Sequence, residues 1–249
     1  MPRHRRRSSR LRWPPACAGR LVPCTGPGWQ ALAAAAAAEG LLYHCERTED
    51  IGYVRVDPAA PGHVLQRSRS HRRNVQRAVR RLEEAGGRCL RVLQPAARAE
   101  VEPLMDVGFA LEDTGWKGQH GTSVVRVRGM RDYFVGEACS LASHGELLLY
   151  FLDHGGRAIA FQYAFRSKGW VLLSKMGYDD EHAKLSPGHV LTLDMLTHLE
   201  AGTQAVDVEF GPMNEATAHW TDRSYPVGTV VIGQDTVAGR VAFATVCRA

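Results

Sequence analysis

The feature that most constrains this chain is a series of three apolar runs separated by two short turns. The runs cover residues 146–152, 158–166 and 170–176, and glycines lie in the turns at 153–156 and 167–169. Short turns with glycine between strand-like runs are typical of antiparallel hairpins. The sequence therefore predicts a three-stranded antiparallel meander in the middle of the chain.

Helical patterns flank this meander. Residues 97–112 and 131–142 precede it, and a helix with one apolar stripe follows it, formed by Val190, Leu193, Leu196 and Leu199. Ser186 is a suitable N-cap for that last helix, and Pro187 suits its first turn. Shorter elements complete the order: strands at 53–56, 88–93 and 205–210, a short helix at 214–222, and strands at 227–232 and 239–246.

The chain has 249 residues, of which 45% are hydrophobic, enough to form a sizeable core. No run approaches the roughly 18 consecutive apolar residues of a membrane-spanning helix, so a membrane span is not expected. The net charge of +5 is weak evidence for a nucleic-acid-binding fold, because six arginines lie within residues 1–12. Without them the net charge is −1.

The N-terminal segment, residues 1–28, is rich in Arg, Pro, Ser and Gly and has no apolar period. We expect a disordered tail there. Three interpretations of this tail stay open: a solvated segment, an upstream extension that is not native structure, or a nucleic-acid-binding arm. A short alanine-rich helix at 29–39 follows it. The six cysteines are scattered without zinc-site spacing, so neither a metal site nor a disulfide framework is expected, and reduced thiols suggest a cytoplasmic protein.

Residues 70–85 form the most basic segment of the body. Ser70 is a candidate cap, two glycines follow at 86–87, and Val75, Val79 and Leu82 give one apolar stripe. Seven arginines and no acidic residue lie between 67 and 81. Two interpretations stay open: a solvated amphipathic helix, or a helix that faces a phosphate-rich partner such as a nucleotide or RNA.

The order of these elements resembles the GNAT acyltransferase fold. This resemblance implies an α/β (α+β) fold with a mixed, mostly antiparallel sheet flanked by helices. Four sequence blocks are more specific: HRRNVQRAVRRLEEAGG, DTGWKGQHGT, GYDDEHAKLSPGHVL and DVEFG. They resemble the acetyltransferase-like family associated with cellulose and exopolysaccharide synthesis (the CelD/BcsL type), which is related to the FemAB-type aminoacyltransferases.

That family resembles a tandem of two GNAT-like halves, so residues 29–66 are interpreted as a remnant of a preceding half and residues 67–249 as the GNAT-like domain. One departure concerns the substrate side. The family usually has a Tyr-Lys pair before a Trp after its last core strand, whereas this chain keeps Trp220 without the pair.

The resemblance implies acyl-coenzyme A as co-substrate, with no metal. Its pyrophosphate is expected at the start of the helix after the meander, because backbone N–H groups and the helix dipole favour anions there. The expected cofactor-binding residues are Lys184, Ser186, Gly188, His189, Val190 and Leu191. Gly188 gives the phosphate room to approach the backbone.

Acyl transfer to an amine needs a base. Asp207 and Glu209 share one face of the strand at 205–210, and His219 carries an imidazole that can act as a base, so these three are the catalytic candidates. Candidate substrate contacts are Trp116, Lys117 and Trp220.

We therefore expect an acyl-coenzyme A-dependent N-acyltransferase that acts on an amine or a sugar-linked acceptor, in exopolysaccharide synthesis on the family resemblance. Nucleic acid is not expected as a partner, except under one alternative. That alternative is an aminoacyl-tRNA-dependent FemAB-like transferase, and another is a non-catalytic module of a polysaccharide synthesis assembly.

Overall fold

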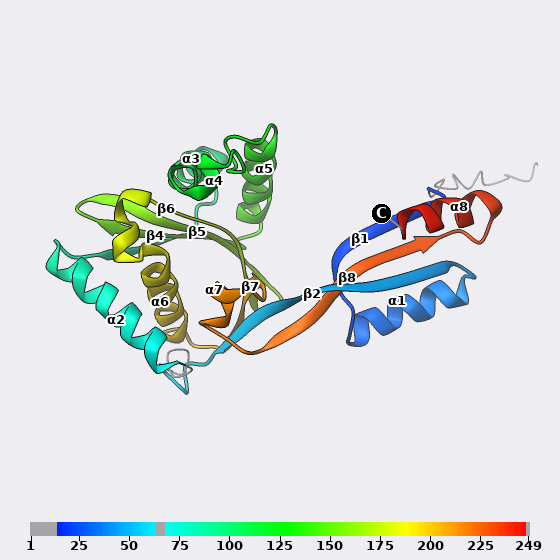
Figure 1. The fold of residues 1–249 in the computed structure, drawn as a ribbon, viewed down its shortest axis with the longest axis horizontal. Coiled ribbons are helices and arrows are strands. Elements are labelled where there is room, and N and C mark those ends of the chain that lie inside the picture. The colour runs from blue at the N-terminus through cyan, green and yellow to red at the C-terminus, as the bar shows by residue number, and fades with distance from the viewer. Residues whose placement is uncertain (1–13, 63–67, 248–249) are drawn as a thin grey trace, which may run out of the picture. The chain divides into compact units, whose positions relative to one another are not determined.

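The structure is a computed structural model that describes residues 14–62 and 68–247. The chain divides into two compact units (Figure 1). One contains the described parts of residues 1–51 and 225–249, and the other contains residues 52–224. The expected boundary between the two parts was at 66/67. The observed boundary lies earlier, because residues 52–56, at the end of a long strand, belong with the second unit.

The meander predicted from the sequence is present in the second unit. Its strands are β4 (Leu147–His154), β5 (Arg157–Ser167) and β6 (Trp170–Tyr178). They pair antiparallel in sequence order, and β3 (Cys89–Leu93) adds antiparallel to β4. On the other side β7 (Val206–Pro212) pairs with β6 in parallel, and the end of β2 (Leu42–Val56) lies next to β7. The sheet is thus mixed and mostly antiparallel, as predicted.

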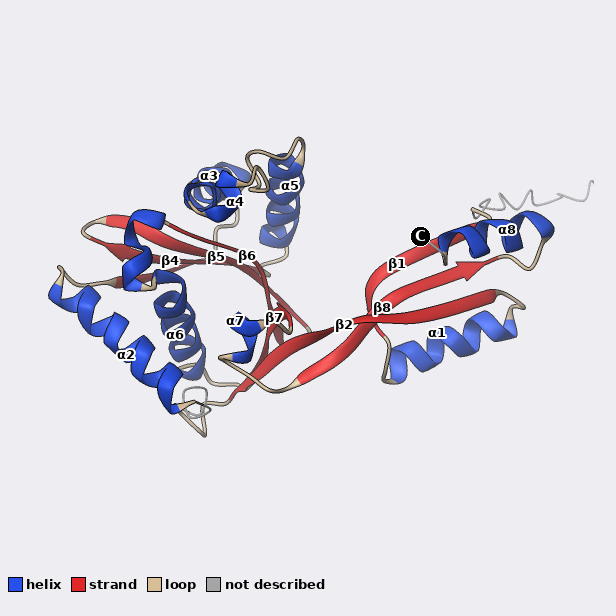
Figure 2. Cartoon of the chain, in the orientation of Figure 1, coloured by secondary structure: helices blue, strands red, loops and turns tan. Residues whose placement is uncertain are grey.

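Helices cover both faces of this sheet (Figure 2). One face carries α2 (Arg69–Glu84) and α6 (Pro187–Glu200), and the other carries α3 (Arg98–Thr114) and α5 (Met130–Ser143). Because both faces are covered, all six residues from 147 to 152 are buried. That is why β4 reads as an uninterrupted apolar run rather than as an alternating one.

Helix α2 matches its predicted apolar stripe. Val75 and Leu82 are buried and Val79 is partly buried, while the arginines of the helix are exposed. The predicted cap was wrong, because Ser68 rather than Ser70 accepts the hydrogen bond from the N–H of His71 (3.3 Å). The sequence also gave no sign that His71 is buried with the stripe.

The first unit corrects two predictions. Residues Ala16–Pro23 form β1, which pairs antiparallel with β8 (Ser224–Gly233), although residues 1–28 were expected to lack regular structure. Residues 1–13 lie outside the described part. The predicted strand at 239–246 is instead part of helix α8 (Val237–Val246), whose N-cap Thr236 accepts from the N–H of Gly239 (3.0 Å). Helix α1 (Pro27–Ala38) matches the alanine-rich run.

The described residues lack two further features. None of the helices there combines the length and apolar character needed to cross a bilayer. Over residues 14–62 and 68–247, no three His, Cys, Asp or Glu side chains are placed to share a metal ion.

Candidate functional site

Strands β6 and β7 separate after a short parallel contact. In the described chain they pair only through residues 170–172 of β6 and 207–209 of β7. Beyond this contact β6 has a β-bulge: Tyr163 pairs with Lys175 and Ala164 pairs with Leu173, which leaves Ser174 as an extra residue. Bulges bend a strand and end its pairing, and they are frequent beside active sites.

A cavity of about 420 Å³ occupies this split, a size typical of small-molecule sites. Strands β5, β6 and β7, the start of α6 and the segment around α7 (Glu215–Ala218) all contribute to its wall. The lining residues are Gln162, Leu173, Ser174, Met176, Tyr178, Ala183, Ser186, Pro187, Gly188, His189, Thr192, Phe210, Asn214, Ala216, Thr217 and Trp220.

The first turn of α6 opens onto the cavity. Ser186 occupies the predicted N-cap position, but it lies in the left-handed region (φ 50°, ψ 50°) and its side chain makes no capping hydrogen bond. Such a conformation costs a non-glycine residue about 1 kcal/mol or more, and it is found preferentially at ligand sites. The helix N-terminus and the uncapped hydroxyl together form a candidate anion site in the cavity wall.

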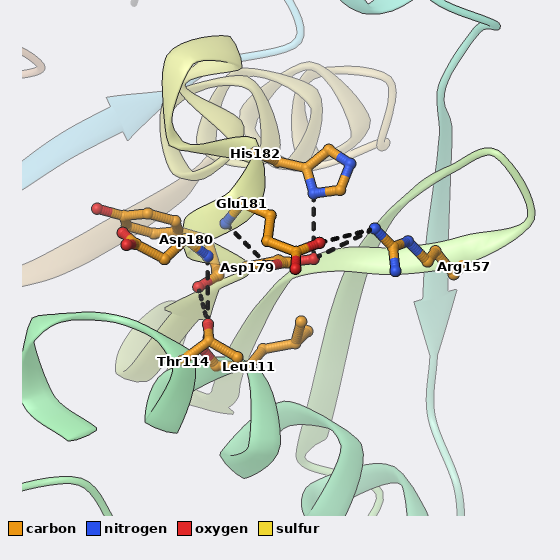
Figure 3. A network of polar contacts seen from close by, with 8 residues as sticks. Leu111, Thr114, Arg157, Asp179, Asp180, Glu181 and His182 are labelled. Carbon is orange, nitrogen blue, oxygen red and sulfur yellow. Dashed lines mark hydrogen bonds and ion pairs between the residues drawn. The ribbon is translucent and has the colours of Figure 1, made fainter. Parts of the chain in front are cut away.

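A polar network fixes the connection between β6 and α6 (Figure 3). The Asp179 carboxylate accepts from the N–H of Glu181 (3.1 Å), contacts Nδ1 of His182 (3.1 Å) and pairs with Arg157 (3.7 Å). The Thr114 hydroxyl donates to the carbonyl of Tyr178 (3.0 Å) and accepts from the N–H of Asp180 (3.2 Å). These contacts tie the connection to β5 and α3, and so hold the start of α6 in place.

Gly188 lies where α6 comes closest to β6. A Cβ atom at this position would stand 3.1 Å from Sδ of Met176 and 3.6 Å from the ring of Tyr178, and both residues line the cavity. Glycine therefore lets the helix approach the strand, and any side chain here would narrow the cavity.

Three histidines from three helical segments gather at the cavity. His71 on α2 stacks on His219 (ring centroids 5.0 Å apart) and meets His189 of α6 edge-on (5.3 Å). Trp220 packs against both His71 (4.7 Å) and His189 (6.0 Å). Of the three histidines, His189 lines the cavity directly.

Two of these histidines, His71 and His189, favour the neutral imidazole. Burial, followed by the charges of His189 and His219, lowers the pKa of His71 to about 4. Burial, and then His219, also lowers the pKa of His189. His71 is 8% exposed, and its Nε2 atom has no hydrogen-bond partner among the residues that the structure describes. At neutral pH His189 can therefore accept a proton from a group in the cavity.

His71 should make the stability of the protein fall in mild acid. Its pKa is about 4 when folded and 6.5 when unfolded, so between these values the unfolded state binds the extra proton. The free energy of unfolding should decrease as the pH falls through this window, by about 3 kcal/mol in total. In His71→Phe the free energy of unfolding, measured by urea denaturation, should depend less on pH, and the contribution of His189 should remain. An unchanged curve would contradict the assignment to His71.

Comparison with known families identifies the domain. The acetyltransferase (GNAT) domain family matches residues 69–220, more than half of the chain. The chain belongs to this family. Among curated protein sequences, none matches the chain significantly.

Solved structures share the GNAT fold at low identity. FemX has a TM-score of 0.60 and 12% identity, covering 87% of this chain and 71% of FemX. A C-terminal DUF2156 domain from Agrobacterium fabrum has a TM-score of 0.54 and 16% identity, with 92% and 71% coverage. The structure of L-PGS from Bacillus licheniformis has a TM-score of 0.50 and 14% identity, with 83% and 66% coverage. At these identities only the fold is shared.

In this GNAT domain the expected cofactor residues divide into three groups. Ser186, Gly188 and His189 line the cavity. Val190 and Leu191 are buried in the core, so only their backbone could reach a ligand. Lys184 is exposed outside the lining, and its carbonyl accepts from Arg81 (3.5 Å).

The acidic candidates of β7 lie apart from the cavity. Asp207 pairs with Arg55 of β2 (2.8 Å), and neither Asp207 nor Glu209 is part of the lining. Their strand neighbour Phe210, whose side chain points to the opposite face, does line it. His219 reaches the site by contact with His71 and His189, and Trp220 is both a lining and a core residue.

The loop candidates have different roles. Trp116 is 58% exposed on the short helix α4 (Trp116–Gln119) and lies outside the lining. Lys117 was expected to contact ligand or solvent, but its Nζ donates to Glu112 (2.6 Å), which is 5% exposed. In the structure Lys117 therefore forms an ion pair with a buried carboxylate inside the GNAT domain.

Several lining residues had no signal in the sequence. Gln162 lies inside an apolar strand, where its Nε2 donates to the carbonyl of Lys175 (3.0 Å) beside the bulge. Ser174 lies on β6, Asn214 is the N-cap of α7 and Thr217 lies within α7, all positions without a distinctive sequence pattern. Only the glycine-bearing helix start gave a local signature.

Proposed function

We propose that this GNAT domain is an acyl-coenzyme A-dependent N-acyltransferase. One observation carries the proposal: the cavity in the split between β6 and β7 is lined by the N-terminus of α6. Past residue 172, β6 has no paired strand on the β7 side within the described chain, so its backbone can hydrogen-bond the amides of an extended ligand there. The helix start can bind the phosphates of that ligand. Acyl-coenzyme A supplies an activated thioester at such a site.

His189 is the residue we propose as the base. It faces the cavity, and its lowered pKa keeps it neutral. It takes a proton from the attacking amine, while His71 and His219 hold its ring in position. The geometry favours His189 over Asp207 and Glu209, which face away from the cavity.

Calorimetric titration with acetyl-coenzyme A tests the cofactor proposal. We expect heat that free coenzyme A competes away, and a loss of at least about tenfold in affinity for Gly188→Val, equivalent to about 1.4 kcal/mol. Gly136→Val is the matched control, because Gly136 is also helical but has open space around its Cβ position. Thermal melts of both variants verify folding. No heat from the wild type, or unchanged affinity in folded Gly188→Val, would overturn the proposal.

A second candidate is transfer from an aminoacyl-tRNA, as in the FemAB-type relatives. The supporting observation is a groove of about 770 Å³ between α2 and α6, lined by Arg73, Arg77 and Arg80. None of these three arginines has an acidic partner among the described residues, whereas Arg88 in the same groove pairs with Asp194 (2.9 Å). RNA binding that weakens with salt and is lost in an Arg73→Gln/Arg77→Gln double variant would favour this candidate.

The acceptor and setting rest on the sequence resemblance alone. On that ground we propose that the acceptor is an amine or a sugar-linked acceptor, used in exopolysaccharide synthesis in the cytoplasm. The absence of the Tyr-Lys pair before Trp220 favours the rival in which the chain is a non-catalytic module of the assembly. Copurification with synthase subunits without any coenzyme binding would support that rival.

A further inference from the structure

Two cysteines of the first unit lie in direct contact. Cys24 follows β1 and Cys45 lies on β2, and their sulfur atoms are 3.0 Å apart, with the Cys45 thiol donating to Cys24. Both side chains are partly exposed. The other four cysteines, all within the described residues, have no such sulfur contact, and each of the six is a free thiol.

The contact passes over a third strand. In this part of the sheet the strand order is β1-β8-β2, so β8 lies between the two strands that lead to Cys24 and Cys45. Gly228 of β8 occupies the crossing point: a Cβ atom there would overlap both the Cys24 sulfur and the carbonyl of Glu46. The missing side chain is what allows the sulfur of Cys24 to reach across β8.

The position of Cys24 is fixed independently of its sulfur. Its backbone N–H donates to the carbonyl of Pro226 (3.0 Å), and Val22 pairs with Gly228. The backbone thus fixes Cys24 where its sulfur lies 3.0 Å from that of Cys45, compared with about 2.05 Å in a disulfide bond.

We propose that Cys24 and Cys45 form a reversible dithiol–disulfide site that reacts with low-molecular-weight disulfides such as oxidised glutathione. One cysteine thiolate attacks the reagent disulfide, forms a mixed disulfide and releases one thiol. The other cysteine then attacks the protein sulfur and releases the second thiol. In sum, two protein thiols are oxidised to one disulfide, and one reagent disulfide is reduced to two thiols.

The bond would close a loop that contains α1 and the first residues of β2. Cross-links of this kind stabilise a fold by restricting its unfolded state. Burial and the neighbouring Cys24 raise the pKa of the Cys45 thiol to about 11, so a step in which Cys45 is the attacking thiolate should be faster at alkaline pH.

Thiol mapping of the full chain tests the proposal. Protein that has been reduced and desalted is incubated with oxidised glutathione, alkylated with iodoacetamide and digested with trypsin. No Lys or Arg lies between Leu21 and Glu46, so one tryptic peptide carries both cysteines. We expect this peptide to lack two hydrogens and to carry no alkyl group, while exposed Cys17 and Cys89 are alkylated or glutathionylated.

Variants separate the proposed pair from general oxidation. Cys24→Ser and Cys45→Ser should each abolish the internal bond, and Cys139→Ser should retain it. The oxidised wild type should melt roughly 5 °C or more above its reduced form, a difference absent in Cys45→Ser. Alkyl or glutathione groups on both Cys24 and Cys45 of the folded wild type, without the internal bond, would overturn the proposal.

Discussion

His189→Gln should reduce kcat about 10²- to 10³-fold while the affinity for acetyl-coenzyme A changes only a few-fold. General-base catalysis by a positioned histidine typically contributes 10²–10⁴ in rate. Glutamine keeps a polar side chain in the cavity wall but cannot take the proton from an amine. The measurement is steady-state kinetics with a primary-amine acceptor at saturating acetyl-coenzyme A, together with calorimetric binding of the coenzyme.

The pH profile gives a second readout that a purely structural role would not change. Because burial and His219 lower the pKa of His189, the acidic limb of the kcat profile should lie below pH 6.5. Removing the neighbouring charge in His219→Ala should raise that pKa and move the limb to higher pH. His144→Gln is the control, since His144 is exposed at the end of α5. A kcat unchanged in His189→Gln would eliminate His189 as the base.

The sequence predicted the fold where its signals are local. The meander could be inferred because the turns at residues 155–156 and 168–169 combine glycines with apolar runs, and these turns form. Strand β1 could not be inferred, because its partner β8 lies about 200 residues away. The apolar residues of α8 are compatible with either a strand or a helix, so their pattern alone could not decide. In the structure the segment is a helix, with Thr236 as its N-cap and with Phe243 packed near Gly233.

In the candidate site, too, residues with a local sequence signal could be predicted and residues brought together from distant parts of the chain could not. Ser186 and Gly188 belong to one continuous helix start, so their place in the cavity wall could be predicted. The histidine cluster combines residues 71, 189 and 219, and no spacing rule relates positions so far apart. His71 even lies in the arginine-rich segment, where the pattern indicated a solvated face. Its burial follows from the rotation of α2 that places Val75 and Leu82 against the sheet.

Lys117→Met should lower the free energy of unfolding by about 3 kcal/mol, even though Lys117 lies in a glycine-rich segment that resembles a ligand loop. The Glu112 carboxylate is 5% exposed and has two partners, Lys117 Nζ at 2.6 Å and the N–H of Val124 at 2.8 Å. Losing the cation leaves a buried negative charge with one neutral donor, and breaking such pairs costs about 3–5 kcal/mol. The lower end applies because the lysine side chain is partly exposed.

The double variant Glu112→Leu/Lys117→Met separates a packing role from ligand binding. Removing both charges also removes the unpaired carboxylate, so most of the lost stability should return in urea unfolding. If Lys117 instead binds substrate, Lys117→Met should have the same free energy of unfolding as the wild type and a raised KM for the acceptor. Adding Glu112→Leu should then not restore that KM. Lys175 lies nearby, and its pKa is lowered mainly by burial, opposed by Glu112 and assisted by Lys117. The double variant should therefore leave Lys175 without the Glu112 carboxylate, which limits how completely stability returns.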